Sequence, residues 1–180
     1  ESEGPLGSCF DVIYTDEYIE AKSWEQAENN ILRHTVNGVF TKAGLTTNDI
    51  DYAFSGDLLN QCTASSFALK DMGIPYFGLY GACSTMAESM SLASVMVDSG
   101  YAQNALAVTS SHFCSSEKQY RFPLEYGGVR TPSAQWTVTG SGAVILSPQK
   151  SDIRIDAVTT GFMVDLGVKD SANMGAAMAP

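Results

Sequence analysis

The residue of this sequence best suited to chemistry is a cysteine that directly follows a Gly-Ala dipeptide. Gly81-Ala82 ends a short apolar stretch, and Cys83 precedes Ser84 and Thr85, where a long helix is expected to begin. The unpaired amides and the dipole at a helix start favour negative charge. They could activate the thiol as a nucleophile or hold the carboxylate of a ligand. The plainer alternative is a small buried Cys83 that permits close helix–sheet packing.

Three loops that follow predicted strands carry the other candidate side chains. Ligands of open α/β sheets bind beyond the carboxyl ends of the strands, so we expect these loops to converge on one crevice. Each side chain also has a plain structural interpretation as a cap, a turn former or a local hydrogen-bond partner. No histidine is obviously placed to activate Cys83 as a general base, and His34 is expected on the surface. The candidate ligand-binding residues are Asp57, Cys83, Ser84, Thr85, Ser110, Ser111 and His112.

The elements that position these residues are predicted to be helices alternating with short apolar strands. A first helix should begin at Ser23, in a Ser-x-x-Gln capping box, and end at Gly44. Its expected buried face consists of Trp24, Ala27, Ile31, Thr35 and Val39. Further helices are expected at 63–72 and 84–99, and strands at 52–55, 75–80 and 105–109. The helix at 84–99 is apolar on almost every side, which is typical of a buried helix.

The C-terminal part of the sequence favours antiparallel strands. Strands are expected at 136–139 and 143–146 around a Gly-Ser-Gly turn at 140–142, with an edge strand at 153–159. Alternating helices and strands form parallel βαβ units, so the predicted fold class is α/β with a mixed sheet. The polar and aromatic segment 110–133 is long enough to be a functional loop or an interface.

The composition of the chain restricts its possible binding partners and its cellular compartment. The chain has 180 residues and a net charge of −10, so we expect one domain and no binding of nucleic acid. Its four cysteines form no CxxC pair and its two histidines lie far apart, so no metal site is expected. A chain this apolar needs no disulfides, which favours a reducing, cytosolic compartment. No apolar run approaches the ~18 residues of a membrane span, and no secretory signal is evident.

Long motifs run through the whole chain and share one resemblance. They are Gly56–Gln61, Gly78–Thr85, Thr109–His112, Glu117–Pro123, Glu125–Gly128, Thr137–Ala143 and Met174–Pro180. Together they resemble the N-terminal half of the stage V sporulation protein AD family, a thiolase-fold family of spore-forming bacteria. The resemblance implies that residues 1–180 form a thiolase-like N-terminal domain around a buried central helix, without the C-terminal half. Cys83 matches the position at which ketoacyl synthases and thiolases carry their acyl-accepting cysteine.

The resemblance implies a ligand-binding protein rather than an enzyme. The implied ligand is dipicolinic acid (pyridine-2,6-dicarboxylate), alone or with calcium, for its uptake into the developing spore. The implied partners are other proteins of one spore membrane complex, at the periphery of the spore inner membrane, and no cofactor is implied. Thiolase-like sites draw basic groups from their second half, so we expect an incomplete pocket here.

Other expectations concern the ends of the chain and its assembly. The chain begins at Glu1 rather than Met, and its tail reads as a connection, so we expect a piece of a longer protein. A half-fold exposes sheet edge and apolar surface, so a homodimer is expected. Two other functions stay open. One is a ketoacyl-synthase-like acyltransferase with Cys83 as its nucleophile, and the other is a subunit that docks proteins through the loop after His112.

Overall fold

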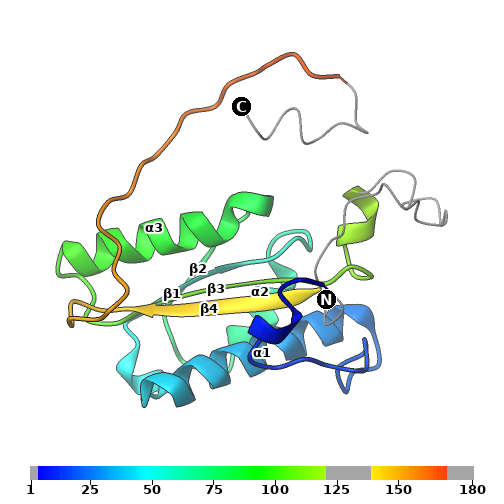
Figure 1. Ribbon diagram of the computed structural model, residues 1–180, viewed down its shortest axis with the longest axis horizontal. Helices are drawn as coiled ribbons and strands as arrows, with labels where there is room; N and C mark the ends of the chain where they lie inside the picture. The colour runs from blue at the N-terminus through cyan, green and yellow to red at the C-terminus, as the bar shows by residue number, and fades with distance from the viewer. Residues whose placement is uncertain (1–3, 121–138, 170–180) are drawn as a thin grey trace.

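The computed structural model describes residues 4–120 and 139–169. Helices α1 and α2 cover one face of a four-stranded sheet, and α3 covers the other (Figure 1). The helices and strands are α1 (Trp24–Ala43), β1 (Tyr52–Gly56), α2 (Thr63–Leu69), β2 (Tyr76–Gly78), α3 (Thr85–Asp98), β3 (Ala105–Ser111) and β4 (Gly140–Leu146). Short 3-10 turns are η1 (Gly7–Cys9), η2 (Thr47–Asp49), η3 (Ala82–Ser84) and η4 (Glu117–Tyr120).

The sheet confirms the predicted mixture of parallel and antiparallel strands. Its strand order is β2-β1-β3-β4, with β1 parallel to both β2 and β3 and with β4 antiparallel to β3. The carboxyl ends of β1 and β3 therefore meet at one edge of the sheet, which is where the loops with the candidate residues begin. The predicted turn at 140–142 is wrong, because Gly142 pairs with Thr109 inside β4. Residues 136–138 of the predicted preceding strand lie outside the described residues.

Helix α1 begins and ends where its sequence signals predict. The Ser23 hydroxyl accepts a hydrogen bond from the Gln26 amide, and Gly44 ends the helix in the left-handed region with φ of 65°. The buried face of α1 differs from the prediction, which placed Thr35 and Val39 on it. The fully or nearly buried residues are Ala27, Glu28, Ile31, Leu32, Val36 and Phe40. The buried row thus includes a carboxylic acid that the apolar pattern had not revealed.

Two apolar layers hold the helices on the sheet. Leu32 and Val36 of α1 pack with Leu106 and Val108 of β3, together with the apolar face of α2. On the other face, Ala93 of α3 packs against alternate residues of β1 and β3. A buried side chain of this size contributes roughly 1.5–3 kcal/mol to stability. The layers therefore fix the direction of every strand that leads into the candidate site.

The prediction that the 84–99 helix is buried all round is wrong for the part of the chain that the structure describes. Only one face of α3 packs on the sheet, through Thr85, Ser89 and Ala93. Away from these three residues, Leu92 is 39% exposed and Val95 is 55% exposed. Among the described residues, no second layer covers these two apolar side chains.

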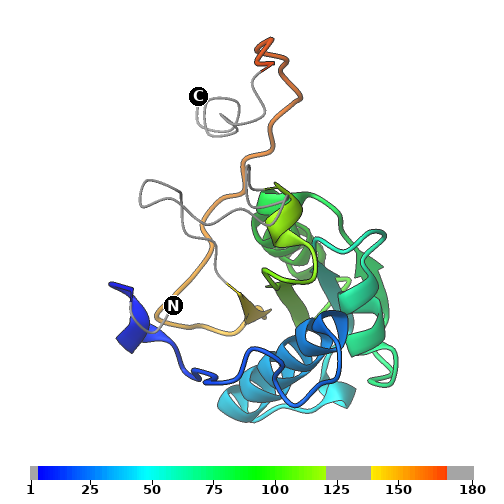
Figure 2. The same cartoon turned by 90° about the vertical axis from the view of Figure 1, so that its right-hand side faces the viewer.

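The segment that follows β4 leaves the sheet on the α3 side as an extended chain (Figures 1 and 2). The strand predicted at 153–159 is wrong, because residues 151–169 form no ladder with the sheet and Ile153 is 88% exposed. Two other elements are shorter than predicted, since α2 ends at Leu69 and β2 spans only Tyr76–Gly78. No helix in the described ranges is long and apolar enough to cross a membrane.

Candidate functional site

The first predicted loop is anchored by Asp57, which directly follows β1. Its side chain is almost fully buried and accepts hydrogen bonds from the Leu59 amide at 2.9 Å, the Ser65 amide at 2.7 Å and the Ser65 hydroxyl at 2.6 Å. These three donors tie the loop to the start of α2. The carboxylate of Asp57 thus serves as a structural cap, which is the plainer of its two sequence interpretations.

The Cys83 turn depends on a close approach between β1 and the start of α3. A Cβ atom built on Gly56 would lie 1.9 Å from the Leu79 carbonyl oxygen and 2.7 Å from Cγ2 of Thr85. Ala82 adopts φ of 49°, in the left-handed region that non-glycine residues rarely occupy. Such local strain is common at binding and catalytic sites. The tight turn places the following residue, Cys83, at the surface.

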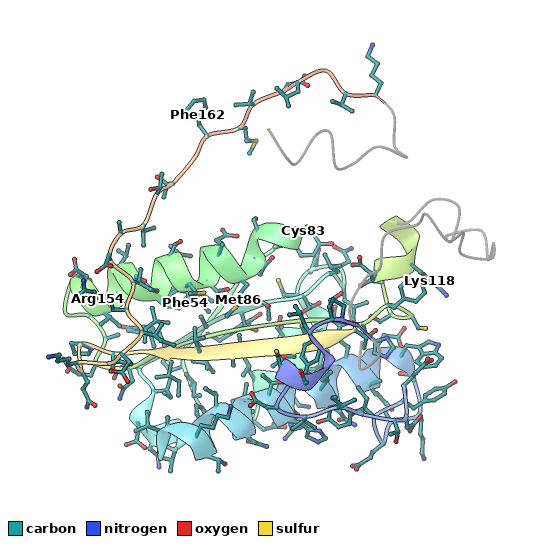
Figure 3. All side chains as sticks on the ribbon, in the orientation of Figure 1. Phe54, Cys83, Met86, Lys118, Arg154 and Phe162 are labelled. Carbon is teal, nitrogen blue, oxygen red and sulfur yellow. The ribbon has the colours of Figure 1, made fainter. Side chains whose placement is uncertain are left out.

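Cys83 itself is exposed, so the alternative of a small buried packing cysteine is wrong. It lies in η3, at the end of α3 on the side of the molecule where Lys118 is found (Figure 3). In the part of the chain that the structure describes, its thiol makes no hydrogen bond to a histidine. The geometry therefore offers an accessible sulfur without a general base beside it.

Several donors predicted for a ligand are engaged within the Cys83 turn. The Ser84 amide and hydroxyl both donate to the Gly81 carbonyl, at 3.1 and 2.7 Å. The Thr85 amide and hydroxyl both donate to the Ala82 carbonyl, the hydroxyl at 2.8 Å. A ligand carboxylate would have to exchange with these bonds, so the helix start is a weaker anion site than the sequence alone predicts.

The third loop continues β3 and carries Ser110, Ser111 and His112. The hydroxyl of Ser111 is buried and has no hydrogen-bond partner among the described residues. His112 is also buried, and its Nδ1 accepts from the Cys114 amide at 3.1 Å. Its Nε2 therefore carries the hydrogen and donates to the Glu17 carbonyl at 2.9 Å. Because both ring nitrogens are engaged, His112 holds the loop together rather than acting as a base for Cys83.

These loops converge on one cleft of about 1350 Å³ at the carboxyl ends of β1 and β3. The cleft is also lined by the N-terminal segment between Cys9 and Ile19, which was not predicted to take part. Ser84 is the one candidate outside the lining. The predicted residues that line the cleft are Asp57, Cys83, Thr85, Ser110, Ser111 and His112.

A buried acid beneath this cleft escaped the sequence prediction. Glu28 of α1 is fully buried, and its carboxyl group accepts from the Ser110 hydroxyl at 3.1 Å and from the Ser115 hydroxyl. Burial, with a smaller contribution from the nearby Asp57 carboxylate, raises the pKa of Glu28 to about 7 against the lowering effect of the two hydroxyls. One signal in the sequence could have identified this acid. Glu28 lies four residues before Leu32 and in the same row as Val36 and Phe40, so it shares the buried side of the helix with them.

The cleft has an acidic lining. Among the described residues around it, the acids are Asp11, Asp16, Glu17, Asp57 and Glu117, against Lys42, His34 and His112. Lys42 is already paired with Asp11, and His34 is hydrogen-bonded to the Tyr14 hydroxyl. No group of three or more acids, histidines or cysteines in the described ranges is arranged to hold a metal ion.

Comparison with solved structures defines the class of fold. The chain is similar to 3-oxoacyl-[acyl-carrier-protein] synthase III from Aquifex aeolicus, with a TM-score of 0.54 and 18% identity over 69% of this chain and 39% of that one. It is also similar to the priming β-ketosynthase of the R1128 polyketide pathway, with a TM-score of 0.54 and 20% identity over 74% and 38% of the two chains. The fold is therefore thiolase-like, and identities this low show the fold alone.

Sequence comparison then gives the family. The family model of stage V sporulation protein AD (SpoVAD) matches residues 1–180. A curated relative, stage V sporulation protein AD of Bacillus subtilis (strain 168), is 46% identical over all 180 residues. The chain belongs to the stage V sporulation protein AD family, as its motifs predict. It covers 53% of that relative, so it spans about half the length of the protein that it matches.

Proposed function

We propose that this chain contributes one wall of a pocket that binds dipicolinic acid during sporulation. The observation that carries the proposal is the single cleft that brings together the exposed thiol of Cys83 and the unpartnered hydroxyl of Ser111. Membership of a sporulation protein family supports the choice of a ligand stored in spores. The ligand would serve uptake into the developing spore, with the protein at the periphery of the inner spore membrane.

The charge of the cleft decides how the ligand binds. Dipicolinate is a dianion near neutral pH, and an acidic lining repels it. Asp57 already accepts three hydrogen bonds, so it needs no counterion from the ligand. We therefore propose that the ligand enters with calcium, whose two positive charges offset those of the dianion, so that the acidic lining no longer repels the ligand. Further basic groups would come from the part of the longer protein that this chain does not span.

Calorimetry with dipicolinate, with and without calcium, tests the proposal. A full-length member of the family should bind the ligand at least tenfold more tightly than this chain alone, because two or three charge-assisted hydrogen bonds of about 1.5–3 kcal/mol hold one carboxylate but not both. Cys83→Trp should abolish binding in the full-length protein, whereas Ala87→Trp, one turn further along α3 and outside the cleft lining, should not. Equal binding by the Cys83→Trp protein would place the pocket elsewhere.

An acyltransferase is the second candidate, and the ketosynthase-like fold favours it. The Cys83 thiolate would attack the carbonyl of an acyl thioester, form a new thioester and release the donor thiol. Both ring nitrogens of His112 are engaged, and His34 makes no hydrogen bond to the thiol among the described residues, which argues against this reaction in the chain itself. Mass spectrometry after incubation with acyl thioesters decides the question. An acyl adduct that forms on Cys83 and then passes its acyl group on would replace the binding proposal.

We also propose that the uncovered face of α3 is an interface between two copies of the chain. Leu92 and Val95 are exposed there, and Phe77 on the edge strand β2 is 49% exposed. Exposed apolar side chains favour association when they gather in one patch. Light scattering should show a homodimer that Val95→Glu dissociates, and a monomer at high concentration would refute this interface. Contacts with other proteins of the spore membrane complex are part of the same proposal and are testable by cross-linking.

A further inference from the structure

The buried acid under the cleft has no cation to balance it among the described residues. The charged groups that act on the Glu28 carboxyl are Asp57, from the loop after β1, and Glu117, at the start of η4, and both are acids. On its own helix, Glu25 is exposed, and hydrogen bonds with its own backbone and with Ser23 lower its pKa. An ionised carboxylate in such a place is disfavoured by burial and by like charge. The neutral acid is the form that suits this environment.

The hydroxyl of Ser115 is positioned to exchange hydrogen bonds with the carboxyl group of Glu28. It lies 3.0 Å from the His112 carbonyl and also within hydrogen-bond distance of Oε2 of Glu28. A hydroxyl has one hydrogen to donate. When Glu28 is ionised, Ser115 donates that hydrogen to the carboxylate. When Glu28 is protonated, the acid donates to the Ser115 oxygen, and Ser115 donates to the His112 carbonyl.

We propose that Glu28 and Ser115 form a proton-dependent hydrogen-bond switch that positions the wall of the cleft between Ser110 and Glu117. Ser110 donates to the other oxygen of Glu28 in both states, so β3 stays attached to α1. The His112 carbonyl accepts hydrogen bonds from the amides of Ser116 and Glu117. The direction in which the Ser115 hydroxyl points decides whether this carbonyl also accepts a third one. His112 lines the cleft, so protonation of Glu28 changes the hydrogen bonding of a residue at the proposed ligand site.

The switch deepens the proposed function and rests on it for its effect on ligand binding. A dianion in the cleft adds negative charge near Glu28 and therefore favours the protonated acid. By linkage, protonated Glu28 favours the dianion to the same degree. Dipicolinate should thus bind about tenfold more tightly at pH 6 than at pH 8, since couplings of this kind typically amount to 5–150-fold.

The switch is tested first without any ligand. In the 180-residue chain, the backbone amide signals of Ser116 and Glu117 should titrate with a midpoint near pH 7, where Glu28 ionises. Glu28→Gln mimics the neutral acid and should remove this titration, while Glu25→Gln on the same helix should leave it in place. Amide signals that stay constant from pH 5.5 to 8.5, or that titrate unchanged in Glu28→Gln, would overturn the proposal.

The second test adds dipicolinate without calcium to the full-length protein, so that the ligand keeps its two negative charges. The affinity of the unmodified protein should fall about tenfold from pH 6 to pH 8, and that of Glu28→Gln less than twofold. An equal fall in both proteins would overturn the coupling to the ligand. If neither protein binds at any pH, with or without calcium, the proposed ligand is wrong, and the amide titration alone decides whether the switch exists.

Discussion

Replacing Glu28 by Gln should change how the stability of the protein depends on pH. Burial raises the pKa of Glu28 from 4.5 to about 7 in the folded chain. The folded state therefore retains a proton that the unfolded state has already lost over this range. For an acid whose pKa is higher in the folded state, the resulting stabilisation of the fold is fully present below the pKa of the unfolded state. It is lost as the pH rises toward the pKa of the folded state.

The magnitude follows from the size of the pKa difference. A shift from 4.5 to about 7, at 1.36 kcal/mol per unit, corresponds to about 3 kcal/mol lost between pH 4.5 and pH 7. Glutamine cannot ionise, and its amide can donate to Ser115 while its oxygen accepts from Ser110. The Glu28→Gln protein should therefore be only slightly more stable than the unmodified protein near pH 5, by less than about 1 kcal/mol. It should be about 3 kcal/mol more stable above pH 7.5.

Urea unfolding at four pH values between 5 and 8.5 measures this difference. The midpoint should shift with an unchanged slope, since the substitution leaves the buried surface the same. Glu25→Gln is the matched control, because Glu25 is exposed one turn earlier and hydrogen bonds with its own backbone and Ser23 lower its pKa. Parallel stability curves for Glu28→Gln and the unmodified protein would refute the reasoning that burial keeps this acid protonated up to about pH 7.

Two further predictions concern the turn that presents the thiol. Gly56→Ala should destabilise the protein by about 2–4 kcal/mol in urea unfolding, because its Cβ would lie 1.9 Å from the Leu79 carbonyl oxygen. Gly38→Ala, in an open position within α1, should instead stabilise it by up to about 1 kcal/mol. Iodoacetamide followed by peptide mass spectrometry should label exposed Cys83 well before Cys62, whose thiol pKa is raised by burial. Faster labelling of Cys62 would contradict the described turn.

Local signals in the sequence were sufficient for most of the fold. The serine cap and the glycine stop define α1 because both act within a few residues of the helix ends. The short apolar strands and their parallel order also follow from the alternation of elements. The Gly-Ser-Gly stretch misled the prediction because glycine marks a turn only when no neighbouring strand pairs with it, and here β3 does.

The sequence predicted where the candidate site lies, but not which hydrogen bonds its side chains make. The carboxyl ends of parallel strands meet by rule, so the convergence of the three loops on one cleft follows from the strand order. Which hydroxyls are already engaged depends on the exact turn geometry, and no spacing in the sequence reports that the Ser84 and Thr85 donors face their own turn. Glu28 was missed because a charged residue in a buried row looks like an interruption of an apolar pattern.

The buried acid and the acidic cleft lead to the same requirement for any anionic ligand. Asp57 and Glu117 stay close to the ligand site whatever Glu28 does, so protonation of Glu28 removes only part of the local negative charge. A dianion then still needs a positive partner, which the described lining supplies only as Lys42, already paired with Asp11. A calcium ion carried by the ligand, or basic groups of a full-length family member, would meet that need in different ways. Binding of dipicolinate by this chain in calcium, but not in its absence, would assign the role to the ion.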